Sequence, residues 1–251
     1  MGTDIHSIVQ VRKAAERFRL LGINDAPPAA PGEWVTVGVA VAGDPRSYNT
    51  FAMLADVRNG RGFAGIKTSD GFPVIHEPRG LPSDLEMLDE YSVKIDRAQL
   101  VAAWDWHGNL VPPDDKESWR LKYMEDDTMS LGDHSYSWAT LAELQVFVAN
   151  IASKWQTRLC GVVDREEYLA AKAENRGFNS WCGDTFGPNV VTVNEPMVGE
   201  ALPACSHVRA SWTVPAMECS RLGQIVEALE HVRAMSGVEA ENVRYVFGFD
   251  S

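Results

Sequence analysis

The sequence has few cysteines, and none of them belongs to a metal-binding pair. Its four cysteines, among 251 residues, are widely spaced and include no C-x-x-C motif. This spacing does not fit a zinc site. Because no secretory leader precedes the first predicted strand, we expect reduced thiols and a cytosolic protein.

Long hydrophobic runs and an excess of positive charge are also missing. No apolar stretch approaches the roughly 20 residues that a membrane-spanning helix needs, so no membrane partner is expected. The chain has 23 basic against 35 acidic residues and a formal charge of −12. Such a charge repels phosphate backbones, which argues against broad nucleic-acid binding but allows a local pocket for a small anion.

What is present is the composition of an ordinary globular protein, with 45% hydrophobic residues. The length suits one domain over residues 1–251. These features and the hydrophobic periodicity predict an α+β fold, in which an antiparallel or mixed sheet contains both chain termini and helices pack on one face. The expected strands cover residues 4–12, 34–42, 207–215 and 242–250. The expected helices cover residues 137–155, 164–175 and 216–235, and a further helix is expected from about residue 47 until Asn59-Gly60 ends it.

A long stretch without regular periodicity interrupts this pattern at about residues 58–135. Glycine and proline mark turns throughout it, and only a short helix at 83–91 and a strand at 99–104 are expected there. Irregular segments of this length are usually functional or disordered. The many aromatic residues of this loop-rich insertion favour an ordered, packed segment.

The first predicted strand carries an acid and an imidazole on one side. Asp4 and His6 share a face because alternate side chains of a strand point the same way. If the first and last strands pair antiparallel, Asp250 lies beside Asp4, and the two carboxylates need a cation, a basic residue or a shared proton. Asp4, His6 and Asp250 are therefore candidate ligands of a divalent metal ion. A polar pair that binds a neighbouring loop is an equal alternative.

A second candidate lies in the stretch GDHSYSW at residues 132–138, which we expect to be a loop that enters a helix. Helix N-termini attract anions, so His134 and Asp133 join His6 as candidate catalytic residues. The alternative is a helix cap, because aspartate and serine are good capping residues.

Arginines in glycine-rich turns form the third candidate. A planar guanidinium beside free backbone N–H groups can hold phosphate or carboxylate. The alternative is that each arginine ties down a loop, and the glycine pattern fits neither the P-loop nor the dinucleotide fingerprint. The candidate ligand-binding residues are Arg46, Tyr48, Asn49, Arg58, Asn59, Arg61 and Arg79.

Several blocks of the sequence resemble a family of phage and prophage proteins that begin MGCDIH. The blocks are MGTDIH, YNTFAMLADVRNGRGFAGI, PRGLPSD, HSYSW and VRYVFGFD, and they touch both ends and the middle of the chain. Thr3 stands where the family has cysteine, so no thiol is available at that position. The resemblance implies a viral gene product in the cytoplasm of a bacterial host, and it implies no activity that can be carried over.

Two functions follow as expectations. The first is metal-assisted hydrolysis of a phosphate ester in a nucleotide-like ligand, with the arginines stabilising the developing charge. The second is a non-catalytic phage accessory or counter-defence protein that binds a host nucleotide signal or a host protein. The sequence leaves open whether the protein is an enzyme, and it does not predict the oligomeric state.

Overall fold

The computed structural model combines helices with mixed and antiparallel sheets, which confirms the α+β class. It describes residues 3–12, 32–115, 117, 119, 127–178, 181–193 and 202–250. The helices are α1 (Tyr48–Ala55), α3 (Leu141–Asn150), α4 (Arg165–Glu174) and α5 (Leu222–Ser236). The strands are β1 (Ile5–Arg12), β2 (Trp34–Val39), β3 (Ser92–Lys94), β4 (Ala102–Trp104), β5 (Leu110–Val111), β6 (Thr128–Ser130), β7 (His134–Thr140), β8 (Gln156–Asp164), β9 (Val190–Thr192), β10 (His207–Pro215) and β11 (Val243–Phe249).

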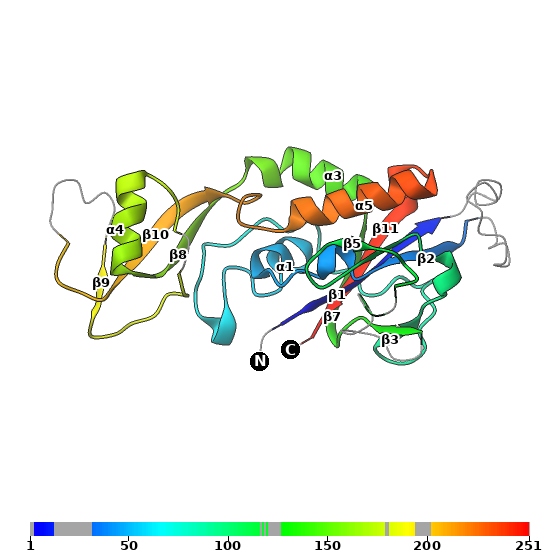
Figure 1. Ribbon diagram of the computed structural model, residues 1–251, viewed down its shortest axis with the longest axis horizontal. Coiled ribbons are helices and arrows are strands. Elements are labelled where there is room, and N and C mark those ends of the chain that lie inside the picture. The colour runs from blue at the N-terminus through cyan, green and yellow to red at the C-terminus, as the bar shows by residue number, and fades with distance from the viewer. Residues whose placement is uncertain are drawn as a thin grey trace.

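The main sheet has six strands in the order β5-β4-β2-β1-β11-β7. β2 and β4 are parallel, and the other neighbours are antiparallel. β1 and β11 pair in the middle of this sheet, with Ile5 opposite Phe249, and both ends of the chain lie at the same edge of the molecule (Figure 1). The prediction of one mixed sheet that contains both terminal strands is therefore confirmed.

The two faces of the main sheet are covered differently. Ile5 and Val9 pack in the large core beneath α1, α3 and α5, which lie together on one side of the sheet in Figure 1. Ile8 and Val246 face the opposite side, where residues of the predicted insertion such as Met129 cover them. The insertion thus supplies the second layer of the fold. It also contributes β4 and β5 to the sheet, but the helix expected at 83–91 does not form there.

A second sheet, β8-β10-β9, projects from the main body with α4 beside it (Figure 1). β8 and β10 are antiparallel over nine residue pairs, from Gln156 opposite Pro215 to Asp164 opposite His207. Val163 and Val208 pack with Tyr168 of α4 in a small core of their own. We call this projecting sheet and α4 the arm.

The expected starts of two helices are wrong. Most of the stretch at 132–138 is not a loop before a helix but the first part of β7, because Ser137 and Ala139 alternate inward and β7 pairs with β11. The helix follows only after Thr140, whose side chain accepts a hydrogen bond from the Glu143 N–H in a capping box. α5 begins at Leu222 rather than at residue 216.

Over the ranges that the structure describes, none of the helices has both the length and the apolar character needed to cross a bilayer.

Candidate functional site

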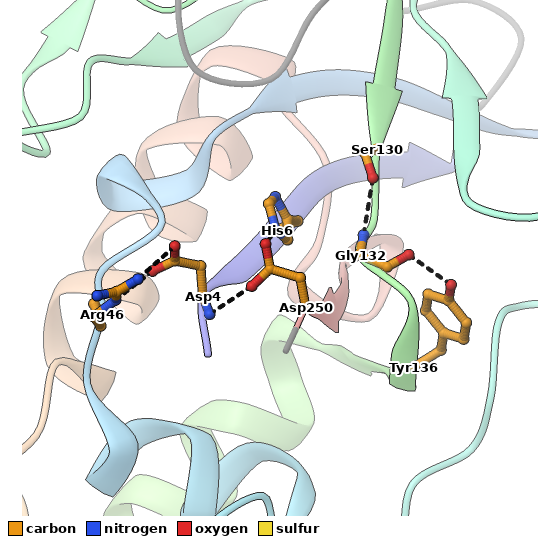
Figure 2. Close-up of polar contacts among 7 residues, drawn as sticks. All are labelled: Asp4, His6, Arg46, Ser130, Gly132, Tyr136 and Asp250. Carbon is orange, nitrogen blue, oxygen red and sulfur yellow. Dashed lines mark hydrogen bonds and ion pairs between the residues drawn. The ribbon is translucent and has the colours of Figure 1, made fainter. Parts of the chain in front are cut away.

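The two terminal strands bring three predicted residues together at one end of the main sheet. The backbone N–H of Asp4 donates to Asp250 Oδ1 at 2.8 Å, and His6 Nε2 lies 3.0 Å from Asp250 Oδ2. Figure 2 shows the Asp250 carboxylate between the His6 ring and the Asp4 backbone. The antiparallel register explains this arrangement. Ile5 lies opposite Phe249, so Asp4, just before Ile5, lies beside Asp250, just after Phe249. We call Asp4, His6, Asp250 and Arg46 the terminal cluster.

Arg46 supplies the positive charge that the two carboxylates require. Its Nε donates to Asp4 Oδ1 at 2.5 Å and its Nη2 donates to Asp4 Oδ2 at 2.7 Å (Figure 2). The hydrogen bond to Asp4 raises the pKa of Arg46 against the opposing effect of burial, and the charges of Asp4, Tyr48 and Asp250 add to it. Of the ways to relieve adjacent carboxylates, the fold uses a basic side chain, because Arg46 binds Asp4, while His6 lies within hydrogen-bonding distance of Asp250.

A strained loop holds Arg46 in place. Ala42 and Asp44 have positive φ angles of 52° and 43°, a region that costs energy for residues other than glycine. The Asp44 carboxylate is 1% exposed and accepts a hydrogen bond from the Ser7 hydroxyl of β1. Ser7 Oγ in turn accepts the backbone N–H of Val41 at 3.2 Å. This buried anchor fixes the chain two residues before Arg46.

The carboxylate oxygens of the terminal cluster are already engaged, which bears on the predicted metal ion. Both Asp4 oxygens accept from Arg46, and Asp250 accepts on both of its oxygens. His6 is only 5% exposed. Within the ranges that the structure describes, no group of three or more His, Cys, Asp or Glu side chains is arranged to hold a metal. A metal at Asp4, His6 and Asp250 would have to displace Arg46.

The other two candidate catalytic residues lie beside this cluster. His134 is opposite Phe249 in the sheet, and the two rings stack with centroids 6.1 Å apart. Phe249 belongs to the face that the helices cover. His6 lies on the opposite face, which it shares with Ile8. Asp133 is exposed and its backbone N–H donates to the Phe249 carbonyl at 2.7 Å. The structure therefore does not unite the three predicted catalytic residues in one constellation.

Two of the predicted arginines line a shared cavity of about 540 Å³. Arg58 lies with its guanidinium 4.8 Å from the centre of the Tyr48 ring and donates to the Gly62 carbonyl. Arg61 donates to the Gly65 carbonyl at 3.1 Å. The residues that line this cavity, which we call the arginine cavity, are Asp56, Arg58, Asn59, Arg61, Asp70, Gly71, Phe72 and Trp155.

The predicted asparagines hold loops in position. Asn59 accepts the backbone N–H of Phe72 at 2.7 Å and donates to the Phe72 carbonyl at 3.0 Å, so it fixes the wall of the arginine cavity. Asn49 on α1 donates to the Cys219 carbonyl at 2.8 Å, near the start of α5. Both asparagines therefore anchor loops, and Arg58 and Arg61 bond loop carbonyls as the alternative interpretation of the arginines predicted.

Arg79 lies away from the arginine cavity. Its two terminal nitrogens form a bidentate ion pair with Glu143, at 2.7 and 3.0 Å, and its guanidinium packs on the Trp138 ring. Burial alone would raise the pKa of Glu143, but the bonds from Arg79 and the Thr140 N–H lower it to about 2. Arg79 thus anchors the start of α3.

This ion pair predicts a loss of stability in acid. A carboxylate whose pKa is about 2 in the folded state and near 4.3 in the unfolded chain stabilises the fold above about pH 5, and this contribution disappears as the pH falls toward 2. Glu143→Gln should lower the melting temperature at pH 7 but have little effect at pH 2. Solvent screening moderates the effect, because the Glu143 side chain is 38% exposed.

The measurement is thermal unfolding by circular dichroism across this pH range. The exposed Glu241 gives the control, because Glu241→Gln should leave the melting temperature close to the wild-type value at every pH. If the difference in melting temperature between Glu143→Gln and the wild type did not change with pH, the ion pair would not be its cause.

The sequence reasoning missed several residues of the arginine cavity. Trp155, 42% exposed, lies just after α3 and before β8, and no local pattern links it to Arg61. Asp70 and Phe72 follow the arginines in the same glycine-rich segment, and that segment was the only available signal.

Comparison of the chain with protein-family models, with curated proteins and with solved structures found no match.

Proposed function

We propose that this protein binds a small anionic ligand that carries a flat ring, such as a nucleotide, in the arginine cavity. The observation that carries this proposal is that Arg58, Arg61 and a half-exposed Trp155 line one cavity of about 540 Å³. This volume lies in the range of small-molecule sites. A guanidinium favours phosphate, and an indole ring offers a surface on which a base can stack.

Binding without turnover is the better supported role. In the terminal cluster, His6 and the Asp4 backbone bind the Asp250 carboxylate, Arg46 binds the Asp4 carboxylate, and His6 is almost fully buried. These bonds hold the two central strands together at their ends. An accessory protein of a phage that withdraws a host nucleotide signal would have a role of this kind.

Arg61→Gln is expected to weaken ligand binding by at least tenfold. A hydrogen bond to a charged group contributes about 1.5–3 kcal/mol, and each 1.4 kcal/mol is a factor of ten in affinity. The measurement is equilibrium dialysis of the protein against a mixture of nucleoside monophosphates, followed by calorimetry with the nucleotide that the protein retains best. Arg233→Gln, which removes the same charge from α5, should bind like the wild type. Equal affinity of the wild type and Arg61→Gln would contradict the proposal.

A second candidate function is hydrolysis of a phosphate ester at the terminal cluster. The observation that favours it is the contact of 3.0 Å between His6 Nε2 and Asp250 Oδ2. The Asp250 side chain is 42% exposed, so a ligand can reach it from solvent. The same nucleotide mixture separates the two functions, because a binding protein depletes a nucleotide and a hydrolase generates product. Product formation that a chelator abolishes would support a metal ion at Asp4, His6 and Asp250.

A further inference from the structure

A second cavity, of about 210 Å³, lies on the arm next to the arginine cavity. Three of its lining residues are cations, namely Lys67, Arg158 and Arg209. We call it the arm cavity, and its lining residues are Lys67, Asp70, Arg158, Cys160, Asp184, Thr192, Val193, Arg209, Ala210 and Ser211.

The two cavities are neighbours because one loop forms a wall of each. Asp70 lines both cavities. Arg61 of the arginine cavity pairs directly with Lys67 of the arm cavity in an antiparallel bridge. The loop at 58–72 lies on the edge of β8, where the Asp70 N–H donates to the Arg158 carbonyl at 2.9 Å. In Figure 1 this cyan segment runs between α1 and β8, at the base of the arm.

The shared wall concentrates positive charge in a chain of net charge −12. Arg61 and Lys67 are like charges directly opposite each other, an arrangement that destabilises a strand pair. Asp70 accepts from Lys67 at 2.7 Å. Arg158 is exposed and donates from Nε to the neutral hydroxyl of Ser211 at 2.9 Å. Together the two cavities hold five arginine or lysine side chains against three aspartates.

An exposed aromatic ring lies by each cavity. Trp155 lines the arginine cavity. Phe186 is 84% exposed, and the guanidinium of Arg209 from the arm cavity lies 3.5 Å from the centre of its ring. Exposed aromatic rings interleaved with cations are typical of surfaces on which successive bases stack.

We propose that the two cavities form one site for a dinucleotide, a ligand with two phosphate groups separated by a nucleoside. One phosphate binds at Arg58 and Arg61, and the other binds at Lys67 and Arg158. Trp155 stacks on one of the bases. This inference rests on the proposed binding function and names the ligand class for it.

The test compares adenosine monophosphate with the linear dinucleotide pApA, which carries two phosphates, by calorimetry at fixed salt. For the wild type we expect pApA to bind at least tenfold more tightly. Arg158→Gln should remove this advantage while leaving the affinity for the monophosphate unchanged, whereas Arg61→Gln should weaken both ligands. Circular dichroism checks the fold, and Lys67→Gln replaces Arg158→Gln if that variant does not fold.

Cys160 gives an independent readout, because its thiol lines the arm cavity. Saturating pApA should slow its alkylation, measured by peptide mass spectrometry, and the monophosphate should not. Cys219, which lies near the start of α5, is the internal reference.

The outcomes separate the inference from the proposed function. Equal affinity for the two ligands, with Arg158→Gln like the wild type, would overturn the dinucleotide site and leave the arginine cavity standing. Much tighter binding of a ten-residue oligonucleotide than of pApA would also overturn it, in favour of a single-strand surface. No binding of either ligand to the wild type would overturn both.

Discussion

Gly248→Ala is expected to lower the free energy of unfolding by about 3 kcal/mol or more. A Cβ atom at this position would lie 2.1 Å from the Leu131 carbonyl oxygen and 2.5 Å from the Tyr136 ring. Overpacking of this kind costs about 1–3 kcal/mol, and more when the backbone cannot move. Gly248 lies in β11 between β1 and β7, so movement of the strand would disturb two ladders.

The segment opposite Gly248 has little freedom to withdraw. Gly132, with φ +80°, approaches the Phe249 carbonyl so closely that a Cβ there would lie 2.3 Å from the oxygen. Its carbonyl accepts the Tyr136 hydroxyl at 2.7 Å, and its N–H donates to Ser130 Oγ at 3.2 Å (Figure 2). The strain of Gly248→Ala therefore falls on β11 itself.

Urea denaturation followed by tryptophan fluorescence measures this loss. Gly177→Ala is the matched control, because a Cβ at Gly177 would meet no atom within 4 Å. That variant should stay within about 0.5 kcal/mol of the wild type. If Gly248→Ala were equally stable, the close approach of residues 130–136 to β11 would not exist in solution.

The second large effect is expected for Arg244→Met, with a loss of about 3 kcal/mol. Arg244 is 3% exposed and donates from Nε to Gln10 Oε1 at 2.8 Å and from Nη2 to Asp84 Oδ1 at 2.7 Å. Burial lowers the pKa of Arg244, and the bond and charge of Asp84 partly restore it. Methionine would leave the buried Gln10 oxygen without its donor, and breaking a buried charged pair costs several kcal/mol. The half-exposed Asp84 moderates this cost, since water reaches it.

Arg12→Met provides the comparison for Arg244→Met. The guanidinium of Arg12 lies 4.9 Å from the centre of the Trp34 ring, and that of Arg244 lies 4.3 Å from the same ring. Arg12, however, is exposed at the end of β1. Its replacement should change the free energy of unfolding by less than about 1 kcal/mol. Equal losses for the two variants would show that stacking on Trp34, rather than the buried hydrogen bonds, stabilises the fold.

The terminal strands themselves could be predicted because they need only local information, whereas their antiparallel pairing joins distant segments and could only be assumed. Alternating apolar residues identify β1 and β11, and strand geometry then decides which side chains share a face. The partner of Asp4 could not be predicted in the same way. Arg46 reaches it from a loop 42 residues away, and the conformation of that loop depends on the buried bond between Ser7 and Asp44.

The elements that were missed depend on tertiary contacts. β8 has a glycine at Gly161, where the backbone of Cys182 approaches so closely that a Cβ would lie 2.2 Å from its carbonyl oxygen. Glycine weakens the strand signal at that position. β7 was obscured because aspartate and serine residues at 133–137 are equally typical of a helix cap.

Some of the residues that line the arginine cavity could be predicted from the sequence, and others could not. The glycine-rich turns pointed to Arg58 and Arg61, because guanidinium groups in such turns bind anions. Trp155, just before β8, and Arg158, within it, reach the same region only because β8 runs past the loop at 58–72. No periodicity of the sequence reports that contact.

The central pairing of β1 with β11 has a consequence for biosynthesis. His6 and Asp250 are 244 positions apart, so the ribosome completes β1 long before its neighbour exists. Until then β1 can pair with β2 on one edge only, and its other edge is an apolar, open strand edge that invites aggregation or capture by chaperones. A truncated polypeptide that lacks β11 should therefore accumulate as insoluble material, since the gap it leaves is in the middle of the sheet.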